Sequence, residues 1–415
     1  MSVKNLFYKF LERTLRFTIT DNVYLATQGS YLTLGNIINV LASFLLAMAF
    51  ARLLPKETYG DYRYIISIIT MIGVFALPGM DDAILQAVAN KFEGSLKIGF
   101  KEKLRWSLLG SFCCLIIGGY FLLLKENPTL AISFLIAGVF FPIMQSTGLY
   151  LSYLGGKKLF KIQVKYNVLT QVISSLAIII TLFLTKNIIV LISVYFASYT
   201  MLGTIFLLFS LKKFPANKNE NVNFIKFGKH LSFLRVLSTI ASQIDKILLF
   251  NLIGPADLAI YSFATLPEAE ANIFLKNIRT LALPKFVNRE KDEIKRTLLK
   301  KIAKATILII PMVLAYIFIA PYLYKIFFPE YMSSVFYSQL FFLMIIAFPG
   351  TLVGLTFQAK MAKKELYWFS ILSSAILIVL LIVLTPIYGI LGVILARLIN
   401  QLTTIGIAVY LFKKM

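Results

Sequence analysis

The sequence predicts an all-α integral membrane protein with twelve transmembrane helices, and two observations support this fold class. Hydrophobic residues make up 59% of the 415-residue chain and the mean hydropathy is +0.80, values well above those of a water-soluble domain. The apolar residues gather in runs of about 20 residues, the length at which a helix crosses roughly 30 Å of hydrocarbon. We place these runs at residues 30–51, 63–80, 106–124, 129–153, 167–185, 188–211, 231–253, 258–279, 302–320, 332–358, 367–385 and 388–412.

The loops between these runs are alternately rich and poor in lysine and arginine. Of the 42 Lys and Arg residues, 34 lie in loops on the N-terminal side of the membrane and 6 in loops on the opposite side. Because cytoplasmic loops carry the excess of positive charge, we predict that both termini lie in the cytoplasm. This orientation accounts for the net charge of +23, so we expect no nucleic-acid partner.

Residues 1–29 are predicted to form a cytoplasmic N-terminal segment. Within it, residues 3–17 alternate apolar and charged side chains at helical spacing. This pattern predicts an amphipathic helix on the anionic inner leaflet, with membrane lipids as its partners. A disordered basic tail is the alternative.

The longest polar interruption in mid-chain, residues 212–230, separates six predicted spans from six. We interpret 30–211 as an N-lobe, 212–230 as a cytoplasmic linker and 231–415 as a C-lobe. An even number of spans gives both halves the same orientation, which is a parallel repeat. The segments LLPKETYGDY and LIGPADLAIY, which follow the first span of each half, support this repeat.

The chain offers little that catalysis would need. Its single histidine, His230, cannot build a metal cluster, and no GxxxxGK[ST] phosphate-binding loop is present. The two cysteines, Cys113 and Cys114, are adjacent in one span and cannot form a relaxed disulfide. We therefore expect no enzyme activity, no metal and no cofactor.

Ionisable residues inside a span cost about 2.5–3.5 kcal/mol each on insertion scales, so they are expected to face a bundle interior or a cavity. In this chain they concentrate in the seventh, eighth and twelfth runs. Arg52 and Arg63 flank the loop after the first run, and we interpret them as interfacial side chains. The substrate-binding candidates are Arg235, Gln243, Lys246, Arg397, Asn400 and Gln401, and the ion-coupling candidates are Asp245, Glu268 and Glu270.

Each of these candidates also has a purely structural interpretation. Asp245 and Lys246 lie about 100° apart on a helix, so they cannot both face the same point. Asp245 is either a cavity or coupling residue or one half of a structural ion pair. Arg397 either binds substrate or neutralises Glu268 or Glu270. Those two glutamates either bind a proton or Na⁺ or cap a helix broken beside a proline.

Four segments give the chain a family resemblance. They are ARLLPKETYGDYRYIISIITMIGVFALPGMDDAILQAVA (51–89), QIDKILLFNLIGPADLAIYSFA (243–264), FPEY (328–331) and YGILGVILARLINQLTTIGIAVYLFKK (388–414). In order and spacing they resemble the polysaccharide transporters, the Wzx-type O-antigen and capsule-unit flippases of the multidrug/oligosaccharidyl-lipid/polysaccharide exporter superfamily. Gln243, Asp245 and Lys246 match that family's seventh-span motif.

The resemblance implies two six-helix lobes around a central cavity. It also implies a bacterial cytoplasmic-membrane flippase that moves undecaprenyl-pyrophosphate-linked oligosaccharide units by alternating access, for O-antigen, capsule or exopolysaccharide assembly. The implied driving force is the membrane potential or a proton or Na⁺ gradient. The implied partners are the lipid-linked oligosaccharide, a polysaccharide polymerase and a chain-length regulator, and the protein is expected to be monomeric.

Three other functions remain open from the sequence. A cation-coupled multidrug exporter of the same superfamily is favoured by Glu268 and Glu270, although the basic residues of the spans argue against cationic drugs. A membrane glycan polymerase would need a larger outer loop than this chain has. A lipid II flippase would be expected to carry two further helices.

Overall fold

The computed structural model describes residues 22–287, 291–359 and 362–414, and the amphipathic helix predicted at 3–17 lies outside them. All regular structure in the described residues is helical. The first half contains α2 (Asn22–Leu53), α3 (Lys56–Ile72), η1 (Gly73–Ala76), α4 (Met80–Ala89), α5 (Ser95–Leu123), α6 (Pro128–Thr147), α7 (Leu149–Gly156), α8 (Phe160–Leu184) and α9 (Ile188–Lys213). The second half contains α10 (Val222–Ala241), α11 (Ile244–Leu252), α12 (Pro255–Val287), α13 (Lys291–Phe327), η2 (Pro329–Tyr331), α14 (Ser334–Leu343), η3 (Met344–Ala347), α15 (Phe348–Thr351), α16 (Gly354–Ala359) and α17 (Lys363–Lys414).

Several helices begin at an asparagine that follows a short turn. The Asn127 side chain accepts a hydrogen bond from the Leu130 N–H at the start of α6. Asn187 and Asn221 cap α9 and α10 in the same manner. Because the first N–H groups of a helix have no partner within it, these caps fix where each helix begins.

Eight of the described helices are long and apolar enough to cross a membrane, or nine if the bent pair α3–η1 and α4 is one span. The direction of the chain bends by 49° between the two parts of that pair. The predicted second span, 63–80, ends where this bend occurs. The predicted span thus covers much of α3 and η1, but it leaves out most of α4 and does not reveal the bend.

The long helix α17 contains two predicted spans, 367–385 and 388–412. Gly389 has φ +59° and ψ −131°, which are not helical angles. A Cβ on Gly392 would lie 2.0 Å from the Leu384 carbonyl oxygen, whereas residues eight apart in a straight helix are about 12 Å apart. The chain therefore reverses at Gly389, and the two predicted spans are separate.

The segments α10–α11 and α12 are the predicted seventh and eighth spans and are too polar to be recognised by hydropathy alone. In α12, Leu258, Tyr261 and Phe263 are fully buried, and the helix packs against α3 and α14. Helix α12 therefore has a face that packs against protein. With these two segments the fold has the twelve predicted spans.

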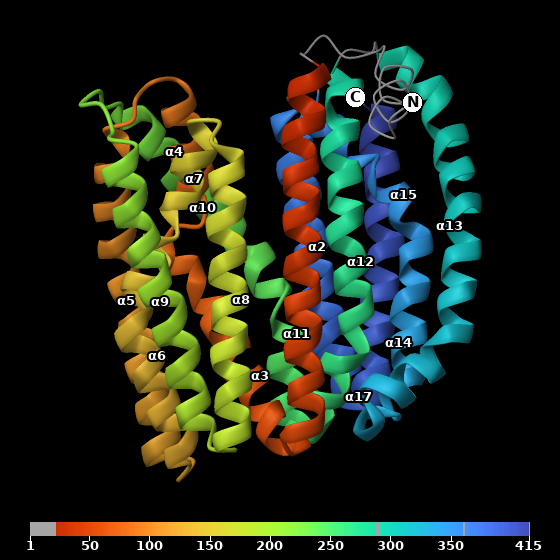
Figure 1. The fold of residues 1–415 in the computed structure, drawn as a ribbon. Coiled ribbons are helices and arrows are strands. Elements are labelled where there is room, and N and C mark those ends of the chain that lie inside the picture. The colour runs from red at the N-terminus through yellow and green to blue at the C-terminus, as the bar shows by residue number, and fades with distance from the viewer. Residues whose placement is uncertain (1–21, 288–290, 360–361, 415) are drawn as a thin grey trace, which may run out of the picture.

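The helices form two lobes, with α5, α6, α8 and α9 on one side of the molecule and α12, α13, α14 and α17 on the other (Figure 1). Helix α2 packs along α8. The loop that follows α9 is part of the predicted linker 212–230, in which the structure places the start of α10 at Val222. Helix α10 packs on α4 of the first lobe as well as on α17 of the second.

The two lobes contact each other closely at the side opposite the N-terminus. There the Arg52 guanidinium donates a hydrogen bond to the Ile326 carbonyl at 2.6 Å, and the Tyr64 and Phe250 rings stack with centroids 3.8 Å apart. Next to them, Gly60 of α3 lies directly against the backbone of Pro255 at the start of α12. A layer of aromatic rings and one backbone-to-backbone contact therefore join the lobes at this side.

Candidate functional site

The break between α10 and α11 places a charged cluster inside the membrane. Asp245 lies in the first turn of α11, where the partial positive charge of a helix start favours a carboxylate, and it is fully buried. Its carboxylate accepts hydrogen bonds from the Arg397 guanidinium and the Tyr261 hydroxyl, and from the Lys246 N–H at 2.8 Å. These contacts match the structural interpretation of Asp245, one half of an ion pair.

Lys246 points away from that ion pair. Its ammonium donates a hydrogen bond to the Gln243 side-chain oxygen at 2.8 Å, and Gln243 is the residue that precedes α11. The two neighbours Asp245 and Lys246 thus have different partners, as their angular separation requires. Lys246 also interacts electrostatically with Arg63 and Arg397, although it is in the lining of neither cavity described below.

Arg397 lies on the second half of α17 and reaches toward α11. Its guanidinium carbon lies 6.0 Å from the Tyr261 ring centroid and 5.8 Å from that of Phe341, within the range of cation–π attraction. Its ion pair is with Asp245, a partner that the structural alternative did not name, and it also interacts electrostatically with Glu268. Its Nε is buried without a hydrogen-bond partner in the described part of the chain.

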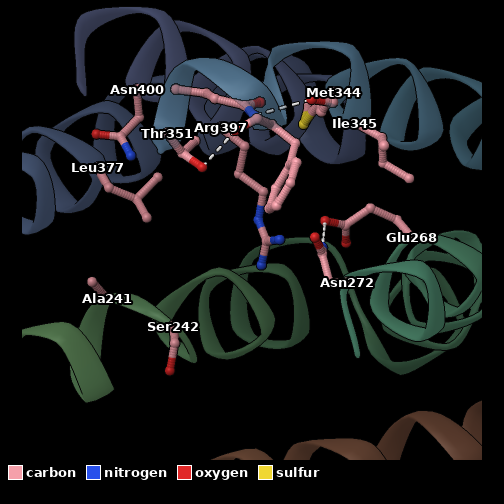
Figure 2. Close-up of a pocket in the computed structure, with 12 residues that line it drawn as sticks. Ala241, Ser242, Glu268, Asn272, Met344, Ile345, Thr351, Leu377, Arg397 and Asn400 are labelled. Atoms are coloured by element: carbon pink, nitrogen blue, oxygen red, sulfur yellow. Dashed lines mark hydrogen bonds between the residues drawn. The ribbon is translucent and has the colours of Figure 1, made fainter. Parts of the chain in front are cut away.

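A cavity of about 540 Å³ lies beside Arg397. Figure 2 shows the guanidinium extending into the space between Ser242 on one side and the hydrogen-bonded pair Glu268 and Asn272 on the other. The buried Asn400 side-chain oxygen has no hydrogen-bond partner among the described residues. The lining consists of Ala241, Ser242, Glu268, Asn272, Met344, Ile345, Phe348, Thr351, Leu377, Arg397, Asn400 and Gln401.

A second cavity, of about 320 Å³, lies between the lobes. Ser43 of α2, Arg63 of α3, Tyr195 of α9 and Glu270 of α12 contribute to its lining. The Arg63 Nε and one Glu270 carboxylate oxygen are buried without a hydrogen-bond partner in the part of the chain that the structure describes. Two opposite charges therefore line one small interior space without pairing.

Glu268 and Glu270 line different cavities. Side chains two residues apart on a helix point in directions that differ by about 200°. Glu268 accordingly lines the larger cavity beside Arg397, and Glu270 lines the cavity between the lobes. Among the described residues no group of three or more His, Cys, Asp or Glu side chains could hold a metal ion. Each of the two cavities thus has one of these two glutamates in its lining.

The structure places some predicted residues elsewhere. Arg235 pairs with Asp82 of α4 and donates to the Pro78 carbonyl at 3.1 Å, so it joins α10 to the first lobe and lines neither cavity. Gln401 lines the larger cavity while donating to the Met344 carbonyl at 3.0 Å. The sequence reasoning missed Arg63, interpreted as interfacial. Its place seven residues after the start of α3, on a face shared with buried tyrosines, was the available signal.

The comparisons with known proteins agree with this architecture. A family model described as "Polysaccharide biosynthesis protein" matches residues 25–275. The chain is similar to the lipid II flippase MurJ in an inward closed conformation, with a TM-score of 0.68 and 17% identity over 94% of this chain and 87% of that one. No curated protein matches the chain.

Two further structures are of a multidrug resistance MATE family transporter of the MOP superfamily. The inward-facing one has a TM-score of 0.65 and 13% identity over 91% of this chain and 94% of that one. The outward-facing one has a TM-score of 0.62 and 14% identity over 93% and 94%. At these identities the likeness establishes the fold, which occurs there in both conformations.

Proposed function

The chain belongs to the polysaccharide biosynthesis protein family, and from that premise we propose that it is a flippase for lipid-linked oligosaccharides. In this proposal it moves undecaprenyl-pyrophosphate-linked repeat units across the bacterial cytoplasmic membrane by alternating access, for the assembly of O-antigen, capsule or exopolysaccharide. A polysaccharide polymerase and a chain-length regulator would then act on its product. The fold is that of membrane transporters and flippases, and we propose transport without catalysis by a monomer.

The observation that carries this proposal is that three cations lie inside the membrane-spanning part, where Lys246 interacts electrostatically with both Arg63 and Arg397. Arg63 comes from the first lobe, while Lys246 and Arg397 come from the second. A pyrophosphate held among them would receive charge-assisted hydrogen bonds, which are stronger than neutral ones and most specific when an arginine fork donates them. Because the cations come from both lobes, a bound anion would couple substrate binding to the relative position of the lobes.

The cavities suit the remaining parts of such a substrate. The space of about 540 Å³ beside Arg397 and the space of about 320 Å³ beside Arg63 would hold the head group. The polyprenyl tail would stay in the hydrocarbon of the bilayer. We propose that both termini lie in the cytoplasm, on the basis of the lysine and arginine distribution. An inside-negative potential then favours outward movement of the anionic head by about 2.3 kcal/mol per charge per 100 mV.

Neutralising the cations tests the proposal. We expect Lys246→Gln and Arg397→Gln to reduce surface glycan strongly while the protein remains in the membrane, because each removes a pyrophosphate ligand. Lys186→Gln, which removes a charge from the exposed turn between α8 and α9, is the matched control. Undiminished glycan in both the Lys246→Gln and the Arg397→Gln variant would refute the cationic site.

A cation-coupled multidrug exporter is the second candidate, because Glu268 and Glu270 put carboxylates in both cavities. Such an exporter would bind cationic compounds through these carboxylates and exchange them for protons or Na⁺. Drug susceptibility of cells that overproduce the protein separates the two functions. Resistance that is lost in Glu268→Gln, together with normal surface glycan in a deletion strain, would favour the exporter.

A further inference from the structure

A row of uncharged polar side chains runs between α2 and α8, apart from the charged cluster. We define this amide track as Asn36, Asn39, Ser43, Gln163, Asn167 and Gln171. Its members are spaced three or four residues apart on each helix, so each helix presents them on one face. On α2 this face lies opposite the exposed apolar residues Leu34, Leu41 and Leu45.

One part of the amide track lines a small cavity. The cavity measures about 130 Å³ and contains Asn36, Asn39, Gln163 and Asn167 in its lining. The two helices approach closely beside it, because a Cβ on Gly35 would lie 2.4 Å from the Val164 Cγ1. The amides therefore surround a space that the close approach of the helices leaves open.

The other part of the track reaches the cavity between the lobes. The Gln171 amide nitrogen lies 3.4 Å from the Ser43 hydroxyl, and the Tyr199 hydroxyl donates to the Gln171 oxygen at 2.8 Å. Ser43 is also part of the lining that contains Arg63 and Glu270. The track thus runs from the cavity between the lobes, along α2 and α8, toward the start of these two helices.

Helix–helix adhesion alone does not account for these residues. Polar side chains often join transmembrane helices through mutual hydrogen bonds, and Gln171 does so. In the 130 Å³ cavity, however, the Asn39 and Gln163 side-chain oxygens are buried without a hydrogen-bond partner among the described residues. A buried acceptor left unsatisfied is destabilising, which indicates that a donor other than the described residues satisfies these two oxygens.

We propose that the amide track binds the neutral sugars of the substrate while the cations bind its pyrophosphate. Sugar hydroxyls both donate and accept hydrogen bonds, and a carboxamide offers both functions in one group. A few such groups at fixed positions give a cavity its specificity. The proposal rests on the proposed flippase function and names the part of the substrate that the first lobe recognises.

The test compares two probes on the full-length protein in lipid nanodiscs. One probe is undecaprenyl pyrophosphate, and the other is the glycan-bearing undecaprenyl pyrophosphate extracted from producing cells. We expect the wild type to bind the glycan-bearing probe more tightly. Asn39→Leu and Asn167→Leu should each weaken that probe about tenfold, through one or two lost hydrogen bonds, and leave the bare probe unchanged.

Ser111→Ala is the matched control, because Ser111 joins α5 to α6 through a hydrogen bond to the Gly138 carbonyl at 2.7 Å, away from the track. It should leave the affinity for both probes unchanged. A melting curve in the same nanodiscs identifies any track variant that does not fold. Such a variant is replaced by Asn36→Ala, which removes an amide without adding volume.

The outcomes separate the two proposals. If the wild type binds both probes equally, or if the track variants weaken both probes alike or neither, the sugar-binding role is refuted and the flippase function stands. If the wild type binds neither probe, the flippase function itself fails.

Discussion

The ion pair between Asp245 and Arg397 is the central contact of the charged cluster. A buried carboxylate without a partner is costly in hydrocarbon, and in this chain it receives three hydrogen bonds. The buried Arg397 Nε has no hydrogen-bond partner among the residues that the structure describes. Asp245 therefore orients Arg397 beside the cavity and leaves part of its guanidinium available to a substrate.

We expect Asp245→Asn to destabilise the protein by about 3 kcal/mol or more, because it leaves a buried guanidinium without its counter-charge. Thermal or denaturant unfolding in detergent measures the loss. Glu268→Gln is the control, since Glu268 bonds to Asn272 and lines the cavity, and it should change stability little. Equal losses in the two variants would contradict a special role for the ion pair.

Glu268 and Glu270 should weaken the binding of an anion. Each carboxylate shares a cavity with a cation, Arg397 or Arg63 respectively. Replacing either by glutamine removes a repulsive charge, so affinity for undecaprenyl pyrophosphate should rise several-fold. A binding titration with that lipid measures the change, and a fall in affinity would indicate that the carboxylates act with the substrate, as an exporter of cations requires.

At the scale of helices, the contact between α3 and α12 controls closure of the side opposite the N-terminus. A Cβ on Gly60 would lie 1.9 Å from the Pro255 carbonyl oxygen, a backbone atom, so the two helices would have to move apart to make room for it. Glycine is therefore the residue that lets the two lobes meet there. When the lobes separate at this side, Gly60 and Pro255 no longer need to be in contact.

Gly60→Val should consequently shift the protein toward a conformation open at the side opposite the N-terminus. The readout is labelling of Thr265→Cys, in the cavity between the lobes, by a membrane-impermeant maleimide in a background without Cys113 and Cys114. We expect labelling to increase and glycan export to fall. Gly119→Ala, where a Cβ would meet no atom within 4 Å, should change neither.

The break between α10 and α11 is a second feature at this scale. Helix α10 is joined to the first lobe through Ser232, whose hydroxyl accepts from the Gly79 N–H at 2.9 Å, and through the Arg235–Asp82 ion pair. Helix α11 packs on α17, which α10 also contacts, and on α3 and α12. The seventh span thus has its two halves in different surroundings, and its charged residues lie at their junction.

For the whole molecule, the distribution of positive charge predicts how the protein lies in the membrane. We expect Lys325→Cys to be labelled by an impermeant reagent from outside the cell, and Lys218→Cys only after the membrane is opened. Both side chains are exposed, so accessibility reports sidedness and not burial. Reversed labelling of the two positions would overturn the topology.

The sequence by itself determined the membrane fold, the twelve spans and the concentration of charge in the seventh, eighth and twelfth of them. These properties depend on the length and polarity of local segments, which hydrocarbon selects directly. Even the weakly apolar α12 was recognised, because the surrounding spans require a crossing at its position.

Only the tertiary structure decided which charges meet. Asp245 and Arg397 are far apart in the chain, and their pairing depends on how α17 reverses at Gly389 and packs on α11. The same holds for Arg63, which helix packing turns toward the cavity, and for the amide track, whose residues come from α2 and α8. Such contacts arise from the packing of distant helices, and local polarity carries no information about them.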